Sequence, residues 1–313
     1  MNNWRHAFLG LLTFTTATYA DLGDDTFGAN DVSTFDQSPQ TPENDKGPFL
    51  LRVSYDAVGK AEFDKSPFKG EKFRFSEFNA DASMVLYYNP CYKEGIVGTV
   101  GWTNDKLDWN DNPYFHEKHF NWANVTLGAF TSRAERWDWK AIVKMYFDPH
   151  HLNFQEYLAW DFMVWGRYEL NCDWGIHGGL LALTGMKIDR FYPIIGFDWR
   201  INDQWKLNLV YPTNISFIYT WNCNWNFALA GRFWEVRHRA GKHEPVEKAL
   251  WVYRNAGLEA AANYIWNSWL TVNAHIGYTF GGTLKVANRH YNNKKTINFK
   301  GAPYIGAEVT ANF

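Results

Sequence analysis

The residues of this chain that could do chemistry are charged side chains at alternate positions of extended runs. Side chains at i, i+2 and i+4 of a strand share one face, so these positions line one surface if the runs form a barrel. Charges enclosed there must be paired with one another or hydrated in a water-filled pore. Seven basic and eight acidic residues form the predicted lumen lining, which gives no strong ion preference: Arg52, Asp56, Asp81, Asp138, Lys140, Lys144, Asp161, Arg167, Glu169, Asp198, Arg200, Lys206, Arg232, Glu259 and Glu308.

Catalytic motifs are absent from the sequence. There is no His-x-Ser pair and no Gly-x-Ser-x-Gly elbow, which lipid-hydrolysing enzymes use to activate a serine. We expect His177 and His275, which lie on strands, to be hydrogen-bonded structural groups. A peptidase barrel would need carboxylates or an Asp–His pair at its outer rim, and the Asp148, His150 and His151 cluster is a single weak match. We therefore predict no catalytic residues.

Histidines gather in the predicted outer loops. Imidazoles at this density could bind zinc or copper, but exposed polar loops also collect histidine without any role in binding. The segment Asp108-x-Asn110-x-Asn112 has some oxygen ligands of a calcium loop but lacks its glycine and closing glutamate. We therefore predict no metal site and no cofactor. The loop histidines are His116, His119, His150, His151, His238, His243 and His290.

The elements that would carry these side chains are strands. Between Phe191 and Ile201 apolar residues alternate with Tyr, Gly, Asp and Arg, which is the period of a strand with two different faces. Such runs reach the roughly 9–11 residues that a tilted membrane strand needs. The pattern predicts an all-β fold, a transmembrane antiparallel up-and-down β-barrel of about 14 strands, with 12 or 16 as alternatives. The predicted strands are 49–58, 72–88, 94–103, 120–131, 136–147, 156–168, 173–186, 191–201, 204–211, 214–221, 224–235, 250–263, 267–280 and 302–313.

The connections fall into two classes, as in outer-membrane barrels with short periplasmic turns and long outer loops. Long loops are expected at 59–71, 104–119, 236–249 and 281–301. Several short turns repeat the pattern Asn, two turn residues and Trp, and asparagine tolerates the backbone angles of turns. We predict that the tryptophans after these turns form an aromatic girdle at the periplasmic interface: Trp174, Trp205, Trp225 and Trp269.

Composition agrees with a membrane barrel. Aromatic residues make up 19% of the 313 residues, and amphipathic Trp and Tyr collect at membrane interfaces. The 31 basic and 33 acidic residues nearly balance, so the sequence lacks the basic footprint of a nucleic-acid partner.

The N-terminus has the pattern of an exported protein. Arg5 and His6 precede an apolar stretch from Ala7 to Thr16, and small residues allow cleavage after Ala20. We predict a signal peptide at 1–20, an acidic, disordered periplasmic tail at 21–48, and an outer-membrane β-barrel at 49–313. The tail contains seven acidic residues and one lysine, with little to bury.

The final strand is the most specific motif. Apolar residues alternate from Pro303 to Phe313, where the sequence ends. This strand resembles the C-terminal signal of bacterial outer-membrane barrels, and the resemblance implies that Phe313 is recognised by the barrel-assembly machinery. Residues 191–280 are similar to uncharacterised outer-membrane β-barrel families of Gram-negative bacteria. That resemblance implies location and fold, with outer-membrane lipid as a partner, and brings no catalytic residues.

The three cysteines, Cys91, Cys172 and Cys223, all lie in predicted periplasmic turns. Disulfides form in that compartment, and an odd number leaves at least one thiol without an intrachain partner. Incidental free thiols and intermolecular bridges to envelope neighbours are both open interpretations.

The function expected from these patterns is a porin-like channel for small solutes, because about 14 strands enclose more space than side chains alone fill. A structural or adhesin-like surface barrel without transport is the alternative, and an outer-membrane hydrolase is a third.

Overall fold

The computed structural model describes residues 48–313 except 152 and 268. The predicted signal peptide, and the predicted acidic tail apart from residue 48, lie outside the described residues. No helix in the described ranges is long and apolar enough to span a membrane.

The described chain is built almost entirely from antiparallel strands. The first group is β1 (Phe49–Glu62), β2 (Lys72–Asn89), β3 (Glu94–Asp108), β4 (His119–Thr131), β5 (Trp137–Phe147), β6 (Leu158–Glu169) and β7 (Trp174–Gly185). The second group is β8 (Arg190–Arg200), β9 (Trp205–Tyr211), β10 (Asn214–Thr220), β11 (Trp225–Arg239), β12 (Leu250–Trp266), β13 (Leu270–Ala287), β14 (Lys295–Phe299) and β15 (Pro303–Asn312). A single helical turn, α3 (Phe154–Tyr157), precedes β6.

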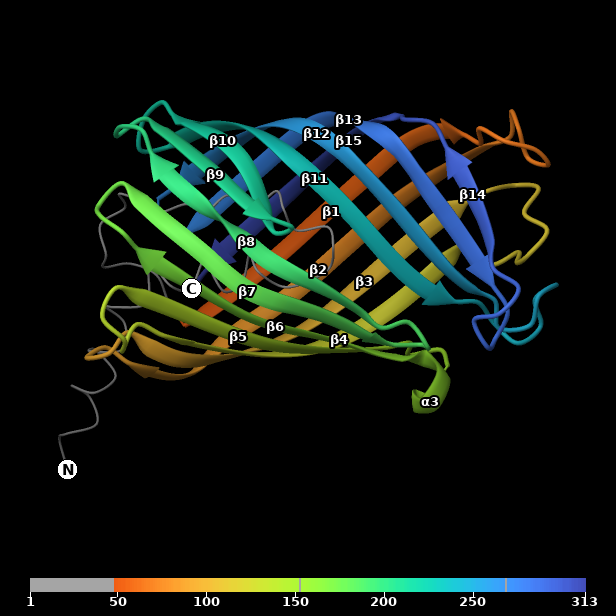
Figure 1. The fold of residues 1–313 in the computed structure, drawn as a ribbon, viewed down its shortest axis with the longest axis horizontal. Helices are drawn as coiled ribbons and strands as arrows, with labels where there is room; N and C mark the ends of the chain where they lie inside the picture. The colour runs from red at the N-terminus through yellow and green to blue at the C-terminus, as the bar shows by residue number, and fades with distance from the viewer. Residues whose placement is uncertain (1–47, 152, 268) are drawn as a thin grey trace.

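The sheet closes on itself. Each strand from β1 to β13 pairs with the next, β13 also pairs with β15, and β15 pairs with β1. Strand β14 pairs with the outer part of β13, beyond the stretch that pairs with β15, and therefore adds a flap to a closed wall of 14 strands within the described residues. The prediction of an all-β antiparallel barrel of about 14 strands is confirmed (Figure 1).

Two details of the predicted strands are wrong. Residues 281–301 were expected to be one loop, yet they contain the end of β13 and all of β14. Several strands, including β1, β3 and β11, also run further than predicted at the long-loop end. These strands are longer than predicted because backbone pairing with a long neighbouring strand continues through residues that no longer alternate between apolar and polar.

The barrel has two distinct ends. At the short-turn end, β1 starts beside the last residue of β15, and Phe49 and Phe313 exchange two backbone hydrogen bonds. The long-loop end carries the connections 63–71, 109–118, 148–157, 240–249, 288–294 and 300–302. Figure 1 shows the C-terminus toward the left of the barrel and α3 toward its right.

The strands have one outer apolar face and one buried face. In β1, Leu51, Val53 and Tyr55 are about half exposed, whereas the alternating residues Arg52 and Asp56 are buried. Because successive strand side chains point to opposite faces, the register that exposes Leu51, Val53 and Tyr55 places Arg52 and Asp56 inside.

Candidate functional site: the barrel interior

The structure places ten of the fifteen predicted lumen residues in buried positions. The other five lie near the short-turn end, where Arg167 and Lys206 are half-buried and Asp138, Glu169 and Arg200 are exposed. All fifteen follow the parity of the buried residues of their own strands. The buried ten are Arg52, Asp56, Asp81, Lys140, Lys144, Asp161, Asp198, Arg232, Glu259 and Glu308.

The largest polar group in the interior is the Arg232 cluster, formed by Asp56, Arg232, Glu259, His275 and Tyr304. Arg232 donates to Asp56 at 2.5 Å and to Glu259 at 3.4 Å. His275 Nε2 lies 2.7 Å from the second oxygen of Asp56, and the Tyr304 hydroxyl donates to Glu259 at 2.7 Å. The cluster therefore links β11 to β1 across the interior. Its other residues come from β12, β13 and β15, the strands that lie between β11 and β1 in the wall.

Three asparagines extend this network toward the short-turn end. His275 Nδ1 contacts Asn273 Oδ1 at 2.7 Å, Asn273 donates to Asn263, and Asn263 donates to Asn226, both also at 2.7 Å. All three amides are buried. These asparagines do not stand out in the sequence, because asparagine is neither charged nor apolar, although each occupies the inward parity of its strand.

A second polar group, the Asp198 cluster, lies closer to the short-turn end. Arg167 donates to both oxygens of Asp198, at 2.7 and 2.9 Å, and His177 Nε2 lies 2.6 Å from Oδ1. The Trp165 indole donates to His177 Nδ1 at 3.0 Å. Since an indole nitrogen only donates, the His177 proton must sit on Nε2 and point at Asp198. Neither ring nitrogen is available to activate a nucleophile.

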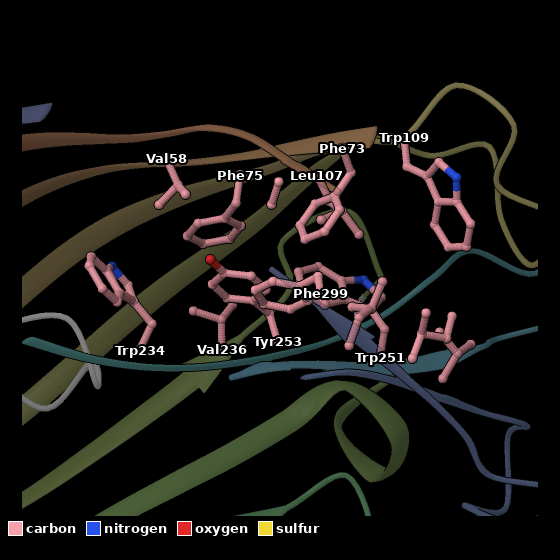
Figure 2. Close-up of a cluster of buried hydrophobic side chains, with 14 of the residues drawn as sticks. Val58, Phe73, Phe75, Leu107, Trp109, Trp234, Val236, Trp251, Tyr253 and Phe299 are labelled. Atoms are coloured by element: carbon pink, nitrogen blue, oxygen red, sulfur yellow. The ribbon is translucent and has the colours of Figure 1, made fainter. Parts of the chain in front are cut away.

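The inward face at the long-loop end differs from the polar surface that the sequence predicted. There it carries the aromatic plug, whose central rings are Phe73 and Phe75 of β2, Trp251 and Tyr253 of β12, and Phe299 of β14. Phe75 stacks on Tyr253 with ring centroids 4.4 Å apart, so side chains from two opposing walls meet. Tyr253 also stacks on Phe299 at 5.4 Å. Figure 2 shows the two facing layers of side chains, which pack against each other within the interior at this end.

The loops above the plug are tied to one another. Glu156 of α3 forms ion pairs with Lys248 and Arg289 from two other loops. Burial opposes ionisation of Glu156, but the hydrogen bonds from Lys248 and Arg289 outweigh it and lower its pKa. Arg239 adds hydrogen bonds to the carbonyl oxygens of all three residues.

Two loop carboxylates next to this region are engaged in local contacts. Glu117 accepts a hydrogen bond from the Gly241 amide, and burial raises its pKa. Asp148, His150 and His151 are the residues whose pattern is a weak match to the rim of a peptidase barrel. Asp148 contacts His151 Nδ1 at 2.8 Å and accepts a hydrogen bond from the His150 amide. Among the described residues, no group of three or more His, Cys, Asp and Glu side chains is arranged to hold a metal ion.

The predicted girdle tryptophans start strands at the short-turn end. Trp174, Trp205 and Trp225 are the first residues of β7, β9 and β11, and Trp269 immediately precedes β13. Trp174 stacks on Trp199, with centroids 4.9 Å apart. The repeated turn has a local cause, because an asparagine side-chain oxygen accepts the amides two and three residues later. These asparagines are Asn171, Asn202 and Asn222.

The remaining predicted residues of this end lie at the surface. Cys91, Cys172 and Cys223 are exposed free thiols. Phe313 is 55% exposed and its ring lies 6.4 Å from that of Trp269.

Comparisons with known proteins identify a family and several distant relatives. The family model described as "Domain of unknown function (DUF6268)" matches residues 110–312. An uncharacterized protein of Chlamydia pneumoniae is 23% identical over 85% of this chain and 87% of its own length. One from Chlamydia trachomatis serovar D is 21% identical over 86% of this chain and 89% of its own length. The sequence prediction of an uncharacterised barrel family is confirmed.

Solved structures with similarity to this chain include two channels. The COG4313 outer membrane channel from Pseudomonas putida F1 has a TM-score of 0.46 at 10% identity, covering 86% of this chain and 96% of that one. A mutant of the TodX monoaromatic hydrocarbon channel has a TM-score of 0.38 at 8% identity, covering 85% and 91%.

Proposed function

We propose that this chain, which belongs to the family described as Domain of unknown function (DUF6268), is an outer-membrane channel for small solutes that is closed in this conformation. The observation that carries the proposal is the division of the interior. The Arg232 and Asp198 clusters lie toward the short-turn end, next to a buried apolar cluster that includes Ile142 and Met163, and the aromatic plug packs across the long-loop end. The proposal includes export through a cleaved signal peptide.

The outer surface supports a membrane location. Large apolar side chains are exposed on strands all around the barrel, for example Val100, Val164, Leu229 and Ile305, each with between 49% and 62% of its surface accessible. Contiguous apolar surface of this extent is costly in water and favourable in hydrocarbon. A closed barrel also satisfies its backbone hydrogen bonds internally, which a bilayer requires.

The interior chemistry supports passage of small solutes rather than catalysis. Both nitrogens of His177 are occupied, and charges of opposite sign pair with one another instead of converging on a reaction centre. The plug is the main obstacle to an open pathway, since its side chains reach across from opposing walls.

Single-channel recording in planar bilayers tests the proposal. We expect rare or small openings from the wild-type protein and larger, more frequent openings after Phe75→Ala combined with Tyr253→Ala, which removes the stacked pair. Tyr55→Ala is the matched control, because Tyr55 is exposed on the outer face of β1. A folded double variant that conducts no better than wild type would contradict a channel gated by the plug.

A structural or adhesin-like barrel without transport is the second candidate. It is favoured by the dense filling of the interior, where Arg232, Glu259 and Ile194 are each at most 2% exposed. The same recordings separate the two candidates: a structural barrel stays silent even when its plug is removed.

At the short-turn end, we propose three further roles consistent with a periplasmic side. The four turn tryptophans form one interfacial girdle, and Phe313 is the element recognised by the barrel-assembly machinery. The three exposed cysteines are available for bridges to envelope neighbours.

A further inference from the structure

The barrel wall changes its construction between β8 and β11. Strands β9 and β10 have only seven residues each, against eleven in β8 and fifteen in β11. Pairing of β8 with β9 begins at Ile195, and pairing of β10 with β11 ends at Gly231. Beyond the hairpin of β9 and β10, β8 continues as Arg190–Ile194 and β11 as Arg232–Arg239 toward the long-loop end (Figure 1). Among the described residues, no ladder of backbone hydrogen bonds joins these two segments. We call this part of the wall the seam.

Side chains hold the seam together in place of a backbone ladder. Glu235 of β11 pairs with Arg190, accepts a hydrogen bond from the Tyr192 hydroxyl at 2.8 Å, and accepts another from Arg254 at 3.1 Å. We call these four residues the clasp. Its members can separate by rotation about side-chain bonds, whereas separating paired strands would break several backbone hydrogen bonds at once.

Arg237 performs a similar task further along β11. Its guanidinium donates to the carbonyl oxygens of Thr184 and Ile188, at 2.9 and 3.2 Å, and to Asp161 at 3.1 Å. These carbonyls belong to the end of β7 and the turn before β8, so one side chain satisfies backbone acceptors there. Pro193, which has no amide hydrogen to donate, lies in the part of β8 without a β9 partner.

Apolar side chains border the seam on both faces of the wall. On the outside, Phe191 and Ile195 are each 65% exposed, and Tyr211 at the hairpin tip lies 6.4 Å from Phe233 of β11. On the inside, Ile194 and Trp234 belong to the two large buried apolar clusters. Apolar side chains therefore lie beside the seam on the exterior and on the interior of the wall.

The other exit from this part of the interior is less favourable for an apolar molecule. The long-loop end is closed by the aromatic plug and by the loops tied together at Glu156. A molecule leaving there would also enter water, which costs about 25 cal/mol for each Å² of apolar surface. Passage through the wall leads directly into hydrocarbon.

We propose that the seam is a lateral route by which small apolar molecules pass between the barrel interior and the outer leaflet, with the clasp as its gate. The proposal rests on the proposed channel function for the path through the remainder of the barrel. It adds the chemical class of the cargo and the place of exit.

A cross-link across the seam tests the route in the intact protein. The three native cysteines, which are exposed at the opposite end, are first replaced by serine. Tyr192→Cys and Glu235→Cys are then introduced together and joined by a short bifunctional maleimide in intact cells of a Gram-negative host. Entry of the apolar fluorophore 1-N-phenylnaphthylamine is followed by its fluorescence before and after cross-linking.

In cells with the Tyr192→Cys, Glu235→Cys protein, we expect the fluorophore to enter faster than with the wild-type protein before cross-linking, because the clasp is lost. After cross-linking, we expect it to enter at the rate of cells that carry the empty vector. The control joins Ala182→Cys to Phe191→Cys, a pair already in register between β7 and β8, and should leave the rate unchanged on cross-linking. Entry that is equal before and after cross-linking, or never above the empty-vector rate, overturns the lateral route. The bilayer conductance of the Phe75→Ala, Tyr253→Ala protein reports separately on the channel. If that protein conducts but cross-linking the seam does not change dye entry, only the lateral route is rejected and the proposed channel stands.

Discussion

Removing the cation of the Arg232 cluster should destabilise the barrel far more than removing a cation at its rim. Arg232→Met keeps most of the aliphatic stem but deletes the guanidinium, leaving Asp56 and Glu259, which are 3% and 1% exposed, without it. Losing one partner of a buried charge group costs about 3–5 kcal/mol. The guanidinium also lies 5.1 Å from the Trp234 ring, a cation–π contact worth about 1 kcal/mol. We expect a loss of about 4 kcal/mol in the free energy of unfolding.

Reversible denaturant unfolding from detergent micelles, followed by tryptophan fluorescence, measures this loss. The matched control is Arg200→Met, because Arg200 is exposed at the short-turn end and its replacement should change stability by less than about 0.5 kcal/mol. In a background of Asp56→Asn with Glu259→Gln, the effect of Arg232→Met should shrink, because no buried carboxylate is then left without its cation. Equal stability of the Arg232→Met and Arg200→Met proteins would refute the electrostatic reasoning.

Four further outcomes are expected. Gly306→Ala should lower the free energy of unfolding by roughly 1–3 kcal/mol, because its new Cβ would lie 2.2 Å from atoms of the Arg232 cluster; Gly231→Ala, with its nearest neighbouring atom at 3.6 Å, should be tolerated in the same assay. Because the pKa of Glu156 is lowered in the folded protein, its ion pairs stabilise the loops above the ordinary glutamate pKa and are lost as pH falls through the lowered value. Protease cleavage of its loop should therefore increase on acidification, and Glu156→Gln should remove this pH dependence. The wild-type protein should migrate differently on gels before and after boiling, and deletion of Phe313 should reduce the unboiled, folded band; normal insertion of the truncated chain would contradict its role in assembly. Non-reducing gels of intact envelopes should show species above the monomer, and a monomeric band with three alkylatable thiols would exclude cysteine bridging.

Much of the interior could be predicted from local sequence because strand parity is a local property. Once Leu51, Val53 and Tyr55 are assigned to the outer face, Arg52 has no other direction than inward. The repeated Asn-x-x-Trp turns are equally local, since the asparagine closes the turn with amides only two and three residues away. The partners of the charged residues could not be predicted in this way. Asp56 and Arg232 are 176 positions apart, and only the closure of the sheet brings them together.

By itself, the sequence determined the strands, their two faces, the turns between them and the closing alternation of β15, because each depends on side-chain periodicity or on hydrogen bonds within a few residues. The tertiary structure alone decided where the interior is polar and where it is blocked. Phe75 and Tyr253 have the inward parity that Arg52 also has, and they form a plug only because opposing walls approach within the reach of two rings. The seam likewise arises from the short length of β9 and β10 relative to β8 and β11, which has meaning only once those four strands are neighbours in one wall.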